Sequence, residues 1–432
     1  MKISKSLQKL AKEFEKKNRH LYIVGGFVRD SLLGYSPQDI DITSNMRIEE
    51  VETICEKLKY KCKIINKHLG TLLISTPKEK YEYTTFRKES YTSGKHSPDE
   101  VEFVDDIRLD ALRRDITINA IYYDIVNDEI IDLLGGRKDL EQGIIRTCND
   151  PMITLKDDGL RILRCIRFAS TFNFQFDKKT YLGLKRFRQN LLNISKERIL
   201  KELKLMVVAD MKFGIYNNIF WDTILDLKLL PLIFNRALVR MRQIPRTIIR
   251  RFYLISEKNR LFTFYMAVLD HYIHRYTKPN QLKFITNMLF GLDGIRESNE
   301  TIRLIEKLYL IYENVENNID IMTASIAYLG LTNGNREMLS LFFSDKANRR
   351  LTGGILLIQS RNLPLNLDDL KICAQDLLDA KIDEKYISQI LVTLYNQVVN
   401  FKVNNEKSEL LACAIAINEA FLDLAKKERN KK

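Results

Sequence analysis

The spacing of apolar and polar residues divides the chain into two parts. Through about residue 145, short runs with β-strand character alternate with helical stretches. These runs are "LYIVGG", "CKIINKH", "GTLLIST", "YEYTTFR", "VEFV", "AIYYDIV" and "EIIDLL". From Leu155 onward, apolar residues recur at helical spacing and strand signals are few. The pattern predicts an N-terminal α/β or α+β domain followed by an all-α part.

The length of the chain favours more than one domain, because 432 residues exceed the size at which a single hydrophobic core stops growing. Near the N-terminus, Leu7, Leu10 and Phe14 share helical spacing and predict an amphipathic helix that packs on the first domain. Charged residues interrupt the longest apolar runs well before the ~18 residues of a membrane span, so we expect no membrane partner. Six scattered cysteines without C-x-x-C spacing suit a reducing cytoplasm.

The charge of the chain makes a polyanionic partner plausible. There are 69 Lys and Arg residues against 56 Asp and Glu residues, which gives a net charge of +13. The stretch "RALVRMRQIPRTIIRR" concentrates arginines without an acid between them, at Arg236, Arg240, Arg242, Arg246, Arg250 and Arg251. Two interpretations stay open: these arginines neutralise phosphates, or they form a solvated helix face.

The stretch "GGFVRDSLLGYSPQDIDITS", residues 25–44, carries the first candidate chemistry. A strand ending in Gly25 and Gly26 leaves the backbone open to a phosphate, and the following helix has an N-terminus that favours anions. Arg29 adds a fixed positive charge. The alternative interpretation of the two glycines is an ordinary tight turn.

In the same stretch, "DIDI" alternates with a period of two. That spacing predicts Asp39 and Asp41 on one face of a strand, with Cα atoms about 6.6–6.8 Å apart. Two such carboxylates can hold one or two divalent cations, which serve in-line phosphoryl displacement. The alternative is a solvated or capping pair.

The order and spacing of several motifs resemble the class II tRNA nucleotidyltransferase and poly(A) polymerase family. "GGFVRDSLLGYSPQDIDIT" resembles the family signature, and "EYTTFR" looks like its strand with a third metal-associated carboxylate. "RRDITINA" is similar to its ribose-recognition motif, and "DLLGGRKDL" to its hinge. "DDGLRILRCIRFA" is similar to its nucleotide-reading helix, and "ISKERILKEL" to the element that closes its neck. Together the motifs cover about the first half of the chain.

The resemblance implies an α+β protein, most like a CCA-adding enzyme. A head related to DNA polymerase β would occupy residues 1–145, a helical neck residues 146–210, and a helical body and tail residues 211–432. Such an enzyme adds C, C and A to the 3′ end of tRNA from CTP and ATP, without a nucleic-acid template, and its body and tail hold the tRNA acceptor arm. The alternatives are a partial CC-adding or A-adding enzyme, a poly(A) polymerase and, from another class, an inactive RNA-binding protein.

The resemblance also implies roles for individual residues. Asp39, Asp41 and Glu82 would be catalytic, and Asp39 and Asp41 would be ligands of two Mg²⁺ ions, which prefer oxygen donors. Arg29, Arg114 and Gly26 would face the phosphates, and Asp115 would accept a hydrogen bond from a ribose hydroxyl. The complete predicted nucleotide-binding set is Gly25, Gly26, Arg29, Arg114, Asp115, Asp158, Arg161, Arg164 and Arg167.

A helix beginning at Asp157 would place Asp158 and Arg161 on one face, with Arg164 and Arg167 continuing the stripe. An ionised aspartate only accepts hydrogen bonds and an arginine only donates them. Cytosine and adenine each present an amino donor beside an unprotonated ring nitrogen, so the pair would match C and A and leave polar groups unsatisfied with U and G. The alternative is a helix salt bridge.

Two features depart from the family pattern. Asp157 stands where the family usually has Glu, so its positioning role is open. Residues 87–101 correspond to a mobile loop that the family uses in changing from C to A addition, but Ser93 and Lys95 stand where Asp and Arg are commoner. The loop keeps its usual length, which disfavours an enzyme that adds only CC.

Overall fold

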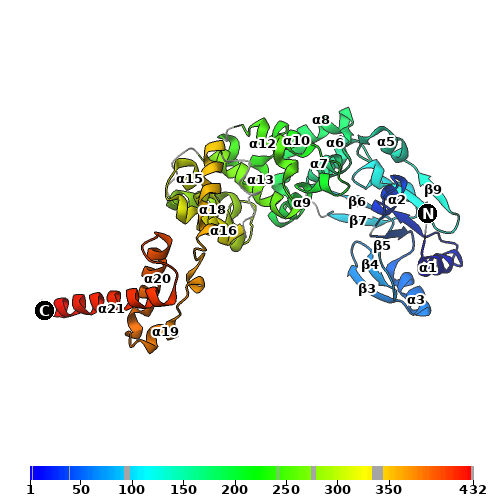
Figure 1. Ribbon diagram of the computed structural model, residues 1–432. Coiled ribbons are helices and arrows are strands. Elements are labelled where there is room, and N and C mark those ends of the chain that lie inside the picture. Colours follow the sequence, from blue (N-terminus) through cyan, green and yellow to red (C-terminus); the bar gives the residue numbers. More distant parts are fainter. Residues whose placement is uncertain are drawn as a thin grey trace. The chain divides into compact units, whose positions relative to one another are not determined.

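The computed structural model describes residues 1, 3–37, 39–91, 98–240, 243–273, 279–332 and 344–429 (Figure 1). The chain forms two compact units. The first comprises Met1–Tyr253 and Asn287–Ser298, and the second comprises Leu254–Thr286 and Asn299–Lys432. The boundaries expected near residues 145 and 210 fall inside the first unit and stay predictions. None of the helices in the described residues is both long and apolar enough to cross a bilayer.

A seven-stranded sheet in the order β3-β4-β5-β2-β1-β8-β9 forms the centre of the N-terminal region. Its strands are β1 (Tyr22–Val24), β2 (Asp41–Ser44), β3 (Lys61–Asn66), β4 (Thr71–Ser75), β5 (Lys80–Thr85), β8 (Ile121–Asp124) and β9 (Glu129–Asp132). Strands β2 and β5 are parallel, and the other neighbours in this sheet are antiparallel. The expected "VEFV" strand instead forms a separate antiparallel ribbon, in which β7 (Glu100–Phe103) pairs with β6 (Arg87–Ser90).

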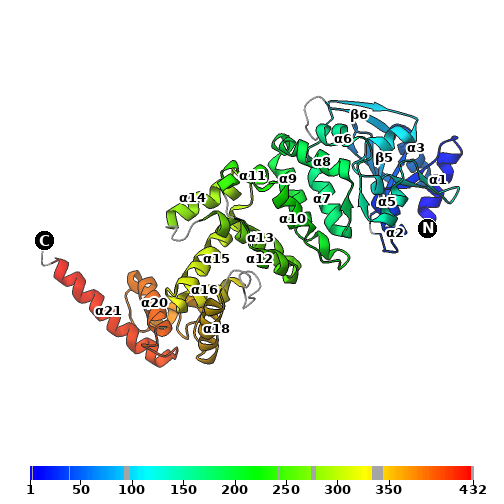
Figure 2. The ribbon, with the colours of Figure 1, turned by 90° about the horizontal axis from the view of Figure 1, so that it is seen from above.

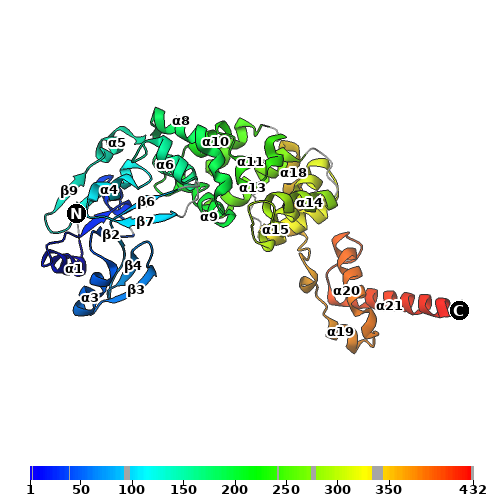
Figure 3. The ribbon, with the colours of Figure 1, turned by 180° about the vertical axis from the view of Figure 1, so that it is seen from behind.

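Five helices accompany this sheet: α1 (Lys5–Glu15), α2 (Gly26–Leu32), α3 (Ile48–Leu58), α4 (Ile107–Leu112) and α5 (Gly136–Gln142). The prediction of an amphipathic N-terminal helix is confirmed. Ser4 caps α1, whose buried side chains are Leu7, Leu10, Ala11 and Phe14. Helix α1 lies beside α3 (Figures 1 and 3), and Lys57 of α3 forms an ion pair with Glu13 of α1 at 2.6 Å.

The remainder of the first unit is largely helical. Its α-helices are α6 (Pro151–Asp157), α7 (Leu160–Phe172), α8 (Lys178–Phe187), α9 (Lys196–Met206), α10 (Ile219–Asp226), α11 (Leu230–Ile233) and α12 (Arg246–Arg251). Eleven of the 13 residues of α7 are buried, including Arg161, so neighbouring elements enclose this helix although it carries three arginines. A two-residue parallel ladder of β10 (Ile144–Ile145) and β11 (Gln175–Phe176) interrupts the helical pattern, which sequence spacing did not predict.

The arginine-rich stretch lies around η4 (Arg236–Arg240) and α12. Arg236, Arg250 and Arg251 are exposed, and Arg246 forms an ion pair with Asp222 at 2.7 Å. Arg242 lies outside the described residues. Both interpretations of this stretch, phosphate contact and solvated face, stay open.

Every regular element in the described part of the second unit is a helix, as expected. The α-helices are α13 (Glu257–Tyr272), α14 (Pro279–Phe290, whose last residues belong to the first unit), α15 (Asn299–Asn317), α16 (Ile321–Thr332), α18 (Asp345–Ser360), α19 (Ala374–Asp379), α20 (Glu384–Val399) and α21 (Lys407–Arg429). Helices α19 to α21 (Figure 1; α20 and α21 also in Figure 2) enclose a separate core that includes Leu377, Ile390, Leu394 and Leu410. The α+β fold prediction is therefore confirmed.

Candidate nucleotide-binding and catalytic cleft

A cleft of about 1280 Å³ in the first unit brings most of the predicted site together. Eleven of the twelve predicted residues line it: Gly25, Gly26, Arg29, Asp39, Asp41, Arg114, Asp115, Asp158, Arg161, Arg164 and Arg167. Glu82 is the one predicted residue that does not. These residues come from α2 and the turn before it, from β2 and the residues before it, from the segment after α4, and from α7 and the residues before it. The chain thus folds distant motifs onto one cavity.

The two glycines form the turn between β1 and α2. Gly25 has φ of +78°, a conformation that residues with a Cβ rarely adopt. A Cβ at Gly25 would also lie 3.5 Å from Oδ2 of Asp41. The strand–turn–helix prediction is confirmed, and the turn lies directly beside a predicted catalytic carboxylate.

The carboxylates differ from expectation in one respect: β2 begins at Asp41, and Asp39 precedes it. The prediction that both share a strand is wrong, because the pairing of β2 with β1 and β5 starts at Asp41. Asp41 and Glu82 are register partners on parallel strands and therefore share a face of the sheet. Burial, followed by the charge of Glu82, raises the pKa of Asp41 to about 6, and Asp39 adds to the effect.

The donor chemistry of this corner fits Mg²⁺. Glu82 and Asp39 place negative charge beside Asp41, which contributes to its raised pKa, and a hard cation would neutralise that charge. Within the described residues, no group of three His, Cys, Asp or Glu side chains is arranged to hold a metal ion by itself. Mg²⁺ sites commonly use one or two carboxylates and complete their coordination with water and substrate phosphates. The pair Asp39 and Asp41 satisfies that requirement.

Arg114 is held by a buried carboxylate that the sequence analysis missed. Asp110, which is fully buried, accepts hydrogen bonds from Arg114 Nη2 at 2.9 Å and from the Tyr122 hydroxyl at 2.7 Å. Burial alone would raise the pKa of Asp110, but Arg113 and Arg114 hold it well below its usual range. The guanidinium of Arg114 is thus oriented within the cleft wall.

Asp115 is similarly fixed. Its Oδ1 accepts hydrogen bonds from the backbone N–H of Ile116 at 2.8 Å and from Asn119, and its Oδ2 pairs with Arg164 at 2.7 Å. Burial opposes ionisation, but Arg164 and these hydrogen bonds lower the pKa of Asp115 to about 2. The side chain is therefore an ionised acceptor at neutral pH.

The start of the helix predicted to read the nucleotide is a second correction. Helix α6 ends at Asp157, Asp158 is extended, and α7 begins at Leu160. A Cβ at Gly159 would lie 2.6 Å from the carbonyl oxygen of Asn190, so the chain turns in contact with η2 (Arg188–Asn193). Asp157 does not line the cleft.

Asp158 and Arg161 nevertheless face the same cleft. Their closest atoms, Oδ2 and Nε, are 3.7 Å apart, which is beyond hydrogen-bond range. Burial raises the pKa of Asp158 to about 6. Arg161 Nη2 donates to the carbonyl oxygen of Arg113 at 2.6 Å, which anchors one side of the guanidinium.

The remaining predicted arginines gather around Phe168, which sequence reasoning did not identify. The guanidinium carbons of Arg29, Arg164 and Arg167 lie 5.2, 5.6 and 4.2 Å from the centre of its ring. Arg29 is buried and donates to Asp30 at 2.8 Å. Each of the three guanidinium groups also has a carboxylate partner, so the ring of Phe168 adds cation–π contacts to charges that are already paired.

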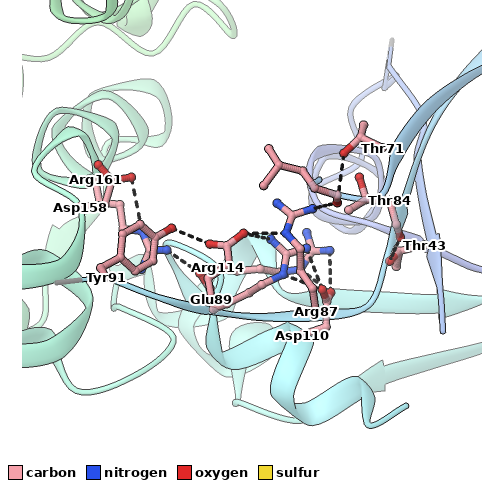
Figure 4. A network of polar contacts seen from close by, with 12 residues as sticks. Thr43, Thr71, Thr84, Arg87, Glu89, Tyr91, Asp110, Arg114, Asp158 and Arg161 are labelled. Atoms are coloured by element: carbon pink, nitrogen blue, oxygen red, sulfur yellow. Dashed lines mark hydrogen bonds and ion pairs between the residues drawn. The ribbon is translucent and has the colours of Figure 1, made fainter. Parts of the chain in front are cut away.

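A network of polar contacts joins α7 to the β6–β7 ribbon (Figure 4). The ring of Tyr91 lies 5.8 Å from the guanidinium carbon of Arg161, and its hydroxyl donates to Glu89 at 2.5 Å. Glu89 also pairs with Arg87 and Arg113. Spacing in the sequence gives no signal for Tyr91 or Glu89, because Arg113 and Arg161 lie far from them along the chain. Ser93, Gly94 and Lys95 of the predicted mobile loop lie outside the described residues.

Comparison with known proteins agrees with this geometry. Residues 21–146 match the family described as the poly A polymerase head domain. The CCA-adding enzyme of Bacillus pumilus (strain SAFR-032) is 41% identical over 177 residues, which are 41% of this chain and 43% of the relative. That of Lactococcus lactis subsp. lactis (strain IL1403) is 40% identical over 223 residues, 48% of this chain and 55% of the relative. The chain spans about half the length of the curated relatives it matches.

Solved structures extend the likeness to the whole chain. The Bacillus stearothermophilus CCA-adding enzyme in complex with CTP superposes with a TM-score of 0.68 at 21% identity, covering 98% of this chain and all of the other. This chain has the fold of the CCA-adding enzymes. The Thermotoga maritima CCA-adding enzyme complexed with tRNA gives a TM-score of 0.67 at 20% identity and covers 96% of both chains. The resemblance stated from the motifs is thereby confirmed.

Proposed function

We propose that this protein is a CCA-adding tRNA nucleotidyltransferase. The observation that carries the proposal is that one cleft contains both the Asp39 and Asp41 carboxylates and the Asp158 and Arg161 pair. The first pair suits phosphoryl transfer and the second suits recognition of a base. The names of the relatives support the same activity, and the fold of solved CCA-adding enzymes supports tRNA as the substrate.

In the proposed reaction, the 3′-hydroxyl of the RNA attacks the α-phosphate of CTP or ATP. A new phosphodiester bond forms between the 3′ oxygen and the α-phosphorus. The bond from the α-phosphorus to the oxygen that bridges it to the β-phosphate breaks, so pyrophosphate leaves. The hydroxyl proton is released. Asp39 and Asp41, with Glu82 nearby, would hold two Mg²⁺ ions, whose charge would favour attack by the hydroxyl oxygen and departure of pyrophosphate. The turn at Gly25 and Gly26 offers open backbone to the phosphates.

The other residues of the cleft orient the nucleotide. Asp115, ionised and held by Arg164, accepts a hydrogen bond from a ribose hydroxyl, which favours ribonucleotides. Asp158 accepts from the amino group of C or A, and Arg161 donates to the ring nitrogen beside it. Arg29, Arg114 and Arg167 form the positively charged walls.

The proposal includes the expected domain roles. Residues 1–145 carry catalysis, residues 146–210 read the base, and residues 211–432 hold the acceptor arm of tRNA. It also assigns the protein to the cytoplasm, where its six free cysteines would stay reduced.

Incubation of the purified protein with Mg²⁺, CTP, ATP and a tRNA transcript lacking its last three nucleotides tests the function. We expect addition of C, C and A, followed by arrest. Extension only of a transcript already ending in CC would instead identify an A-adding enzyme, and arrest after CC a CC-adding enzyme. A long A tract on unrelated RNA would identify a poly(A) polymerase, and RNA binding without extension an inactive protein.

A deletion in the predicted mobile loop tests how one cleft serves two bases. Shortening residues 90–97 should leave C addition intact and impair A addition, because the cleft must change shape between the two bases. Equal loss of both activities would show that the segment supports the cleft as a whole.

A further inference from the structure

Two of the cations that line the cleft have no carboxylate ion partner among the described residues. Almost every arginine and lysine that lines the cleft has a carboxylate ion partner, as Arg164 has in Asp115 and Arg167 has in Glu202. Among the described residues that line the cleft, Arg198 and Lys201 are the cations without such a partner. The charge of these two side chains is therefore available to an anionic ligand.

Both cations belong to α9 and are exposed. They are three residues apart, so they occupy the same side of the helix. Glu202, the next residue, turns toward α7 and pairs with Arg167, whose neighbour Arg164 holds the proposed ribose acceptor. Helix α9 thus supplies Glu202 as the partner of an arginine on α7. It also presents Arg198 and Lys201 to the open side of the cleft.

The unpaired carboxylates lie on a different element. Asp39 and Asp41 form no ion pair with a described cation, and they belong to the segment around the start of β2. The triphosphate of a nucleotide would be held there, beside the Gly25 turn, according to the proposed function. That leaves the cations of α9 for the other substrate.

We propose that Arg198 and Lys201 bind backbone phosphates of the unpaired 3′-terminal strand of the RNA. This inference rests on the proposed function and assigns the RNA strand to one wall of the cleft. Unpaired, exposed cations suit this task because RNA must enter and advance by one nucleotide after each addition. A buried and fully paired arginine could not follow such movement without breaking its ion pair.

A binding experiment without nucleotide tests the assignment. The full chain and the double variant Arg198→Ala/Lys201→Ala are titrated with two transcripts, a tRNA ending in three unpaired 3′ nucleotides and the same tRNA with a blunt acceptor stem. We expect the double variant to bind the first transcript about tenfold more weakly, which is about 1.4 kcal/mol. The slope of log K against log salt should become shallower by about 1.4, because each single-strand phosphate contact contributes about 0.7. The blunt transcript should bind both proteins alike.

The double variant Lys185→Ala/Arg186→Ala is the matched control. These cations are exposed on α8, have no carboxylate partner among the described residues, and lie outside the cleft. An equal loss in this control, or an equal loss on the blunt transcript, would overturn the proposal, because the effect would then be one of general surface charge.

Steady-state kinetics separate the RNA strand from the nucleotide as the ligand. We expect the KM for tRNA to rise in Arg198→Ala/Lys201→Ala while the KM for CTP stays within about twofold. A rise confined to CTP would reassign the cations to the triphosphate and refute the proposal. If the wild-type protein binds and extends tRNA but the variant behaves identically, the proposal alone fails. If the wild-type protein neither binds nor extends tRNA, the proposed function fails with it.

Discussion

Replacing Asp41 by asparagine should stabilise the protein while abolishing nucleotide transfer. The pKa of Asp41 is raised from the usual 3.8 to about 6, first by burial and then by Glu82 and Asp39. At 1.36 kcal/mol per pKa unit, the full effect would be about 3 kcal/mol. Because Asp41 is exposed to the water of the cleft, both the burial penalty and the repulsion are smaller than this full value, and we expect a gain of about 1 kcal/mol in the free energy of unfolding.

The pH dependence gives this prediction its sign. A carboxyl group whose pKa is raised in the folded state binds more protons there than in the unfolded chain, so wild-type stability falls as pH rises from about 4 to about 6. The asparagine side chain of the variant cannot ionise. The variant should therefore match the wild type near pH 4 and exceed it above about pH 6. Urea denaturation in EDTA, monitored across pH 4–8, measures the difference.

Metal binding supplies the second half of the assay. Mg²⁺ should stabilise the wild type through binding to the folded state and should stabilise Asp41→Asn less. The control is Glu102→Gln, which removes an exposed carboxylate on β7 outside the cleft and should change neither stability nor Mg²⁺ response. An Asp41→Asn variant that is less stable than the wild type at pH 8 in EDTA would refute the reasoning about repulsion.

Three further outcomes follow from the cleft. Asp158→Ala and Arg161→Ala should each lower the kcat/KM preference for CTP over UTP by one to two decades, because loss of a buried partner costs about 1–3 kcal/mol. An unchanged preference would leave the pair only an ion pair at the start of α7. As pH falls through about 6, protonation makes Asp158 a donor, so UTP incorporation should rise in the wild type but not in Asp158→Ala. Gly159→Ala should lower the free energy of unfolding by about 1–3 kcal/mol in thermal melts, since its Cβ would meet Asn190, whereas Gly353→Ala, with open space around it, should not.

Sequence reasoning succeeded where the chemistry is local. The turn at Gly25 depends on a backbone conformation that only glycine adopts easily, and the following helix is signalled within a few residues. Alternation also identified the strand at Asp41. Alternation could not predict the first residue of that strand, because β2 begins where its backbone first pairs with β1 and β5.

The remaining features depend on contacts between distant segments. The break before α7 arises where Gly159 meets the backbone of Asn190. Asn190 lies well beyond the end of α7 in the sequence, so helical periodicity alone placed the start of α7 too early. Tyr91 and Phe168 look like ordinary core aromatics in the sequence. Their role as platforms for guanidinium groups appears only when α7 packs beside the β6–β7 ribbon and α2.

The separate core of the last helices bears on how such a chain can change over evolution. Its buried members run from Leu370 to Ala414, and the partly buried side chains around them belong to residues 363–421. Substitutions there can compensate one another locally, so drift in this module need not propagate to the side chains around Asp41 or Arg161. The chain has the fold of the CCA-adding enzymes along nearly its whole length, although the two curated relatives match less than half of it. The interior of this module is therefore constrained by its own packing rather than by the chemistry of the cleft.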